Sequence, residues 1–460
     1  MSNDGLSTEE MPPDDRAAGG AAAGDRAAFW PPAQLIASAL RFALGVTARR
    51  GGVALADQMV ASGTNFVTTI VIGRAVAKDQ FGLYSLGFTL AVAALAVQNS
   101  LISAPYMVYS PRLKGPDHAR YAGSTFLHQL AMVAVCLVVF AAVGAILSLG
   151  AGPAGLAPVV WALAAASPFI LLRGYARGLC FAGLRMGTAL LLDGAVAVLQ
   201  LGTLIVLAKL GKLSASRAFL TIGLACGIAG VVWAVAARRA FLMDLGQAVA
   251  DLKRNWSLGK WVLGTAVARE ASSGVFPWFV AAFHGVGAAG AFAACVNLVM
   301  LANPFLVAMT NLLVPTVSHV SARGGGHRMR SLVLKSSVLL FAAMSVLFAV
   351  MLAWGGRLVA LVYGSQYAGY GLAVSLLGFS FLVRSFVLPV DAGLLATERP
   401  DVMMKSHLAG GAVSLTLGTL LVWLHGVVGA AAADVVKTLV TTAFRLTFFW
   451  ARGTRPAEPD

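Results

Sequence analysis

The chain has 460 residues, of which 58% are apolar and only 12% are charged. Soluble domains contain about 45 to 50% apolar residues, and a water-soluble protein of this length could not bury the excess. The formal net charge of +15 would suggest a nucleic-acid partner in a soluble protein, but here the placement of the basic residues decides its meaning. The composition excludes an ordinary soluble fold and predicts a membrane protein.

Twelve apolar runs follow one another, most of them about 17 to 25 residues long, the length that crosses a bilayer as a helix. They follow a polar amino-terminal segment that we expect to be disordered and to contain no cleavable signal peptide. The predicted spans are about 51–73, 83–110, 121–148, 157–174, 187–208, 218–237, 261–283, 290–318, 333–354, 371–391, 404–424 and 428–449. The sequence therefore predicts an all-α polytopic membrane protein of about twelve transmembrane helices.

Lys and Arg residues concentrate in alternate loops. With the amino terminus inside, 25 of the 34 lie in cytoplasmic segments, 6 lie in outer segments and 3 lie within spans. This pattern follows the positive-inside rule, so it predicts an even number of spans and two cytoplasmic termini. We therefore expect the excess positive charge to face anionic lipids of the inner leaflet, with no nucleic acid as a partner.

The second half of the chain repeats parts of the first at a slowly growing offset. Gly178-Leu179 matches Gly393-Leu394, and the Leu-Gly-Thr-Leu run at 201–204 recurs at 417–420. Two six-span copies enter the membrane from the same side, so their axis should lie along the membrane normal, with the substrate path between them. The predicted domains are a disordered tail 1–40, a lobe 41–237, a basic linker 238–260 on the inner surface, a lobe 261–450 and a tail 451–460.

Three short stretches carry a resemblance to a known family. In residues 73–86, Arg74 closes one span and Phe81-Gly82-Leu83-Tyr84 opens the next; the other two stretches are residues 363–368, Tyr-Gly-Ser-Gln-Tyr-Ala, and 429–433, Gly-Ala-Ala-Ala-Ala. Together they resemble the polysaccharide flippases of the multidrug/oligosaccharidyl-lipid/polysaccharide exporter superfamily. The resemblance implies two six-helix lobes around a central cavity. It also implies that lipid-diphosphate-linked sugars cross to the outer leaflet by alternating access, with cations facing the diphosphate.

Arginines in the spans are the candidate substrate-binding residues. A charge on the lipid face at the bilayer centre costs about 2.5 to 3.5 kcal/mol, whereas a guanidinium in a wet cavity can bind phosphate through two parallel hydrogen bonds. We therefore predict Arg269 and Arg384 as diphosphate contacts, and the resemblance adds Arg74 at the outer end of the first span. The alternatives are an interhelical ion pair for Arg269 and snorkelling to the interface for Arg74.

Four carboxylates are candidates for ion coupling: Asp57, Asp193, Glu270 and Asp391. Asp57 is close to the inner mouth, where we favour a merely solvated carboxylate. Asp193 has no partner at helical spacing. Asp391 shares one helix face with Arg384, seven residues earlier, although it could simply mark the inner boundary of its span.

Two close pairs of opposite charge also lie in spans. Adjacent helical residues point about 100° apart, so we expect Arg269 and Glu270 not to pair with each other. Asp434 and Lys437 are three residues apart and share a face, so we expect a structural ion pair there.

We expect an inner-membrane flippase that moves polyprenyl-diphosphate-linked oligosaccharide for exopolysaccharide or O-antigen assembly. Anionic inner-leaflet lipids and a polysaccharide polymerase are further candidate partners. The alternative is a multidrug or cation antiporter of the same superfamily, which the arginines in the spans disfavour.

Other classes of function find little support in the sequence. It contains no nucleotide-binding motif, and its longest outer loop, about sixteen residues, is close to ordinary connection lengths. The sequence therefore predicts neither ATP-driven transport nor an enzyme such as a membrane glycosyltransferase. The four cysteines are isolated, so we expect no disulfide, metal site or cofactor.

Overall fold

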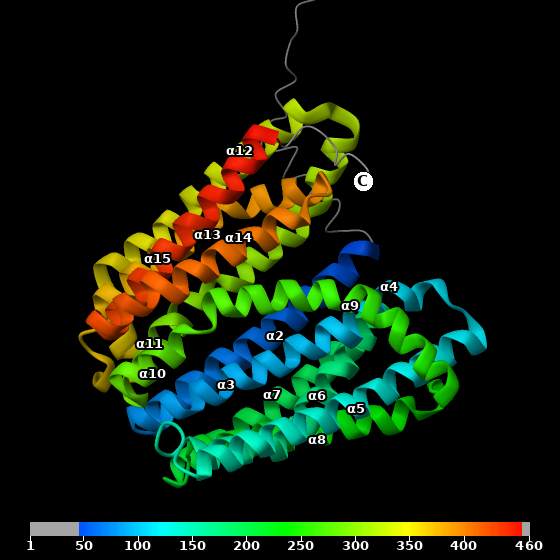
Figure 1. The fold of residues 1–460 in the computed structure, drawn as a ribbon, viewed down its shortest axis with the longest axis horizontal. Coiled ribbons are helices and arrows are strands. Elements are labelled where there is room, and N and C mark those ends of the chain that lie inside the picture. The colour runs from blue at the N-terminus through cyan, green and yellow to red at the C-terminus, as the bar shows by residue number, and fades with distance from the viewer. Residues whose placement is uncertain (1–45, 453–460) are drawn as a thin grey trace, which may run out of the picture. The chain divides into compact units, whose positions relative to one another are not determined.

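The computed structural model describes the backbone of residues 46–452 and the side chains of residues 52–321 and 326–451. Nearly all of this part belongs to one compact unit that begins at Arg50, and the following description concerns that unit. The predicted tails, residues 1–40 and most of 451–460, lie outside the described residues. Within the described range the regular structure is entirely helical, as the sequence predicts (Figure 1).

The helices follow one another through short turns, in keeping with the alternation of apolar runs and polar loops. Their bounds are α2 Val46–Ala75, α3 Lys78–Gln98, α4 Ala104–Tyr109, α5 Gly115–Ser148, α6 Leu156–Ala182, α7 Met186–Lys209, α8 Ala215–Ala237, α9 Leu245–Ser273, α10 Phe276–His284, α11 Val286–Val299, α12 Asn303–Tyr363, α13 Gly371–Ala396, α14 Pro400–Val413 and α15 Thr419–Arg452. Short π-helical turns join α3 to α4 and α14 to α15.

Twelve membrane crossings account for this helix set. Nine helical segments of the described chain are long and apolar enough to span a membrane, and one of them, Pro400–Ala451, folds back at Gly426 and so crosses twice. The remaining two crossings are α2 and the α9–α10 pair, which carry more polar residues. The predicted twelve-helix polytopic fold is confirmed.

The helices form two lobes, α2–α8 and α9–α15, as the internal repeat predicts. In the first lobe α6 packs against α3, α5 and α8; in the second lobe α13 packs against α12 and α15. Small residues allow the helices to approach closely, as is usual in membrane bundles. At the α6–α8 contact, a Cβ added to Gly223 would lie 2.6 Å from the Cβ of Ala166.

The lobes meet tightly at the end of the bundle that holds the α2–α3 turn, here called the closed end. There α3 packs against α11, and their backbones touch through two glycines. A Cβ added to Gly82 would overlap the carbonyl oxygen of Val286, and one added to Gly290 would lie 2.9 Å from the nitrogen of Gly82. No larger side chain fits at this crossing.

Aromatic rings and backbone contacts reinforce the closed end. Phe81 of α3 packs against Tyr363 and Tyr367 of the second lobe, with ring centroids 5.8 and 6.1 Å apart. The Gln366 amide donates hydrogen bonds to the carbonyls of Gly73 and Val76, at 3.0 and 3.2 Å. These contacts join the turn between the first two helices to the segment between α12 and α13.

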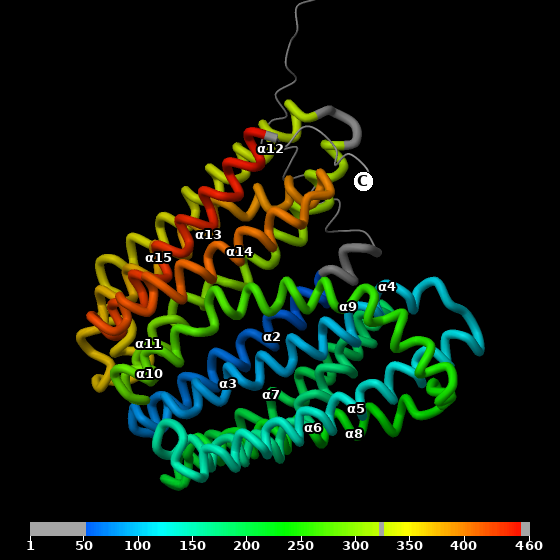
Figure 2. The backbone as a smooth tube through the Cα atoms, in the orientation of Figure 1, coloured from blue at the N-terminus to red at the C-terminus, as the bar shows by residue number. Residues whose placement is uncertain are grey.

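Helix α9 contacts both lobes. Its first half packs against α4, α5 and the π-helical turn after α3, and its second half packs against α14 (Figure 2). Asn255 accepts a hydrogen bond from Tyr121 of α5 at 2.8 Å, and His128 of α5 is 2.8 Å from the carbonyl oxygen of Ala248. The predicted linker-to-span boundary at 260/261 therefore falls inside one continuous helix, because buried polar contacts hold its first half against the amino-terminal lobe.

The glycine crossing yields a test. Gly82→Leu should force α3 and α11 apart, because overpacking a tight contact usually costs about 1–3 kcal/mol. We expect a lower unfolding temperature in detergent. Cys295 is fully buried on α11, so in a variant in which it is the only cysteine we also expect its thiol to be modified faster. Gly63→Leu is the matched control, since a Cβ at Gly63 meets nothing within 4 Å. Equal behaviour of the two variants would contradict the tight crossing.

Candidate functional site

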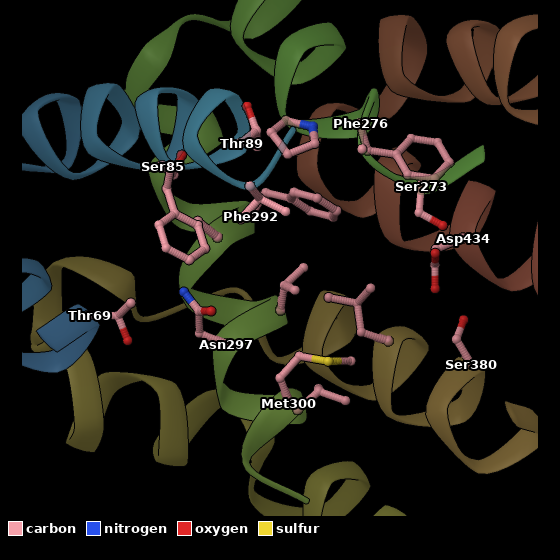
Figure 3. A pocket seen from close by; sticks show the side chains of 18 of the residues that line it. Thr69, Ser85, Thr89, Ser273, Phe276, Phe292, Asn297, Met300, Ser380 and Asp434 are labelled. Carbon is pink, nitrogen blue, oxygen red and sulfur yellow. The ribbon is translucent and has the colours of Figure 1, made fainter. Parts of the chain in front are cut away.

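A cavity of about 430 Å³ lies between the two lobes. The amino-terminal lobe contributes α2 and α3 to its wall, and the carboxy-terminal lobe contributes α9, α10, α11, α13 and α15. Much of the lining is aromatic: Phe81, Tyr84, Phe88, Phe276, Phe292 and Phe381. Polar groups interrupt this surface on several sides, among them Thr69, Ser85 and Asn297 (Figure 3). We call this space the central cavity.

A second cavity of about 400 Å³ lies inside the carboxy-terminal lobe, between α9, α12, α13, α14 and α15. Its lining includes four cationic side chains, those of Arg269, Arg384, Lys437 and Arg445. We call it the cationic cavity. The two cavities adjoin, because Glu270, Ser273, Arg384 and Lys437 line both of them.

Three of the four cations have a carboxylate partner. Arg445 is 2.8 Å from Asp391, and its guanidinium also donates to the hydroxyl of Ser406 at 2.8 Å. Lys437 pairs with Asp434, three residues earlier. Arg269 lies 3.4 Å from Glu270. Each of these three cations is thereby at least partly neutralised inside the carboxy-terminal lobe.

Arg384 is the exception. Among the described residues it has no hydrogen bond and no ion pair, yet its side chain borders both cavities. Its surface is exposed even though α13 lies well inside the bundle, so it faces the cavity space. An unpaired guanidinium in such a place is a ready site for an anion, because it has five hydrogen-bond donors and keeps its charge at any physiological pH.

Asp434 belongs to the same corner of the central cavity. Its carboxylate pairs with Lys437, whose ammonium also donates to the hydroxyl of Ser273 at 3.0 Å. In Figure 3 the hydroxyl groups of Ser273 and Ser380 both point toward the carboxylate of Asp434. The predicted Asp434–Lys437 ion pair is confirmed.

The expectation that Arg269 and Glu270 do not pair is wrong. Their Cβ directions diverge as on any helix, but the long guanidinium side chain bends back along the helix surface and reaches the neighbouring carboxylate. Both side chains line the cationic cavity, and Glu270 also lines the central one. Asp391, predicted to share a wall with Arg384, lines the cationic cavity with it and is held there by Arg445.

Arg74 lies at the closed end, away from both cavities. Its guanidinium donates to the carbonyl oxygen of Val362 at 2.8 Å and to that of Leu361. These are among the last carbonyls of α12, which have no partner within the helix. In this structure Arg74 caps α12 and joins the two lobes, and it is not among the residues that line the cavities.

Asp57 and Asp193 form a separate cluster within the amino-terminal lobe. Arg177 of α6 lies 2.6 Å from Asp57 and 2.9 Å from Asp193, and Arg173 lies 2.8 Å from Asp193. Both carboxylates are almost completely buried. The favoured interpretation of Asp57 as a solvated residue is therefore wrong, since α2, α6 and α7 enclose it with an arginine.

Sequence reasoning missed Arg173, Arg177 and Arg445, because the positive-inside count assigned all three to cytoplasmic loops. Arg173 and Arg445 were detectable, since they fall within the predicted spans 157–174 and 428–449. Arg177 was harder to detect, because the predicted span ended at residue 174 while α6 continues to Ala182.

Comparisons with known proteins bear on the fold. No protein-family model and no curated protein matches this sequence significantly. Solved structures do match. One is an inward-facing multidrug resistance transporter of the MATE family of the MOP superfamily, with a TM-score of 0.68, 13% identity and coverage of 86% of this chain and 95% of that one.

Two further structures share the arrangement. The lipid II flippase MurJ, in an inward closed conformation, matches with a TM-score of 0.71 and 9% identity, over 86% of each chain. A MOP superfamily transporter from Pyrococcus furiosus, described by the reverse polarity of its binding pocket, matches with a TM-score of 0.60 and 13% identity, over 87% of this chain and 93% of that one. This chain has the same fold as these transporters. The fold implied by the short sequence motifs is thus confirmed.

The amino-terminal cluster generates a prediction about stability. Asp193→Ala would leave Arg173 without a partner and Arg177 with only one, and breaking a buried ion pair costs about 3–5 kcal/mol when one charge remains. We expect a markedly lower unfolding temperature in detergent. Asp117→Ala is the control, because the Asp117–Arg120 pair is exposed and such pairs contribute about 0–1 kcal/mol. If both variants unfold like the parent, the cluster does not stabilise the lobe.

Proposed function

We propose that this chain is a flippase that moves a polyprenyl-diphosphate-linked oligosaccharide across the inner membrane by alternating access. The observation that carries the proposal is Arg384, the cavity arginine without a hydrogen bond or ion pair in the described structure. A diphosphate would supply the counter-ion that Arg384 lacks, through charge-assisted hydrogen bonds. The similarity in fold to a lipid II flippase supports a lipid-linked substrate.

The aromatic lining of the central cavity suits the remainder of such a headgroup. Sugar rings have apolar faces and polar edges, and aromatic side chains combine a large apolar surface with little loss of conformational freedom. Phe81, Phe276 and Phe292 supply that surface, and Asn297 supplies a polar amide. In this proposal the diphosphate binds at Arg384 and the glycan lies toward the aromatic wall.

The proposal also covers orientation and partners. The positive-inside pattern supports cytoplasmic termini, so the closed end would face the outside and the cavities would load from the cytoplasmic leaflet. Exposed basic residues such as Arg238 and Arg239, at the end opposite the closed end, would bind anionic lipids of that leaflet. A polysaccharide polymerase that takes the flipped product is the proposed protein partner.

The alternative, a multidrug or cation antiporter, has support from the similarity to a MATE transporter. The charges that line the two cavities argue against it. Four cations, Arg269, Arg384, Lys437 and Arg445, accompany three carboxylates, Glu270, Asp391 and Asp434. A cationic drug would meet no unpaired carboxylate there, whereas an anion meets an unpaired arginine.

The first test replaces the unpaired cation. Arg384→Ala should weaken binding of a soluble sugar diphosphate by about 10- to 100-fold, since hydrogen bonds to charged groups contribute about 1.5–3 kcal/mol. It should also abolish flipping of a fluorescent polyprenyl-diphosphate sugar in proteoliposomes. Arg384→Lys keeps the charge but loses the forked geometry, so intermediate binding is expected.

Arg357→Ala is the control for this test, because Arg357 is exposed and outside both cavities. Unchanged binding and flipping in Arg384→Ala would refute the proposed function. Binding of a cationic drug that survives in Arg384→Ala and is lost in Glu270→Gln would favour the antiporter.

A second test uses a substitution that is expected to strengthen substrate binding. Asp434 neutralises Lys437, so Asp434→Asn should free that ammonium and tighten binding of the sugar diphosphate by about 3- to 30-fold, or about 0.7–2 kcal/mol. Flipping should slow, because transport requires binding weak enough for release. Calorimetric titration and the proteoliposome assay measure the two effects. Weaker binding in Asp434→Asn would mean that the carboxylate positions Lys437 for the substrate.

A further inference from the structure

A third cavity, of about 340 Å³, lies at the seam between the lobes, bounded by α3 on one side and by α9 and α10 on the other. We call it the slot. Its walls are almost entirely apolar, and several lining residues are small, including Ala93, Ala96 and Ala266. Val267 lines the slot and has 58% of its surface exposed, so the slot reaches the lateral surface of the bundle.

The slot adjoins the central cavity. Thr89, Glu270 and Gly274 line both spaces, and the indole of Trp278 donates a hydrogen bond of 2.9 Å to the hydroxyl of Thr89 where they meet. Among the described residues, Glu270 alone lines all three cavities. An aromatic space, a cationic space and an apolar space therefore converge on one side chain.

This convergence matches the chemistry of an amphiphile with three parts. We propose that the slot holds the hydrocarbon chain of the transported lipid while its diphosphate binds at Arg384 and its glycan occupies the central cavity. This inference rests on the proposed function and adds to it the binding site of the chain. A chain drawn into the polar cavities would lose contact with apolar surroundings, whereas an apolar slot that reaches the lateral surface preserves that contact.

Glu270 has a specific part in this arrangement. A carboxylate at the inner end of an apolar slot repels a diphosphate and is itself held by Arg269 at 3.4 Å. Arg384, the lining cation without an ion pair among the described residues, therefore attracts the headgroup, and the neutral chain is the part of the substrate that can lie along the slot. The length that α3 contributes, from Thr89 to Val97, is about 12 Å at 1.5 Å per residue, so the rest of a longer chain would remain in the bilayer.

The test fills the slot without touching the cations. Ala266→Trp places a large ring in the slot, and Thr265→Trp places the same ring next to it, on an exposed position that lines none of the three cavities. Each variant is assayed for binding of a water-soluble sugar diphosphate without a chain, and for flipping of the polyprenyl-linked form. We expect Ala266→Trp to bind the soluble ligand within about twofold of the parent and to flip at least tenfold more slowly, while Thr265→Trp retains both activities.

The outcomes separate the two proposals. If Ala266→Trp flips the lipid as fast as Thr265→Trp does, the slot does not hold the hydrocarbon chain, and the proposed function is unaffected. Failure of Arg384→Ala to weaken soluble-ligand binding would overturn the proposed function itself. A photoreactive group near the diphosphate end of the chain should label α3 and α9 at the slot in the parent. Equal labelling by a photoreactive phospholipid that is not transported would instead mean that an ordinary acyl chain occupies it.

Discussion

Charge compensation inside a bundle surrounded by lipid is the constraint on which the rest of this structure depends. An ionised side chain there needs either a partner or water. The amino-terminal lobe meets the requirement internally, because Asp57 and Asp193 are balanced by Arg173 and Arg177. The carboxy-terminal lobe meets it for three of the four cations at its cavities and leaves Arg384 to the cavity space. The two lobes thus differ in how completely ion pairs among the described residues balance their interior charges.

The closed end explains why the cavity space lies where it does. The backbones of α3 and α11 touch at Gly82 and Gly290, and aromatic rings from both lobes fill the region beside them. Apolar packing and hydrogen bonds from the Gln366 and Arg74 side chains to backbone carbonyls therefore hold this end together, and neither side chain lines the central or the cationic cavity. The cations lie deeper in the carboxy-terminal lobe, so an anion bound there would leave the seal intact.

Much of the fold could be predicted because hydropathy records the main physical requirement, that each crossing satisfy its backbone within a helix. The helix count, the two lobes and the fold shared with the solved transporters all followed from run lengths, weak repeats and short motifs. The site was less accessible. Arg74, whose motif suggested a substrate contact, caps the end of α12. Arg177 and Arg445 were counted as loop residues although each pairs with a carboxylate on another helix.

The reason is that a sequence gives spacing along one helix, whereas the partner of a buried charge is chosen by packing between helices. Asp434 and Lys437, on one helix face, could be paired correctly. Asp57 and Arg177, 120 residues apart, could not. Only the arrangement of α2, α6 and α7 decides that these two groups meet.

Helix α9 limits how the two lobes can move relative to each other. Tyr121 and His128 anchor its first half to one lobe, and its second half packs against α14 in the other. The lobes are therefore tied by a continuous rod on this side of the molecule, and any rearrangement that exchanges access between the two faces has to bend that rod or pivot about it. Displacement would then be smallest for the helices next to α9 and largest for the helices farthest from it. The two lobes would rotate about α9 as a hinge axis and would not separate evenly.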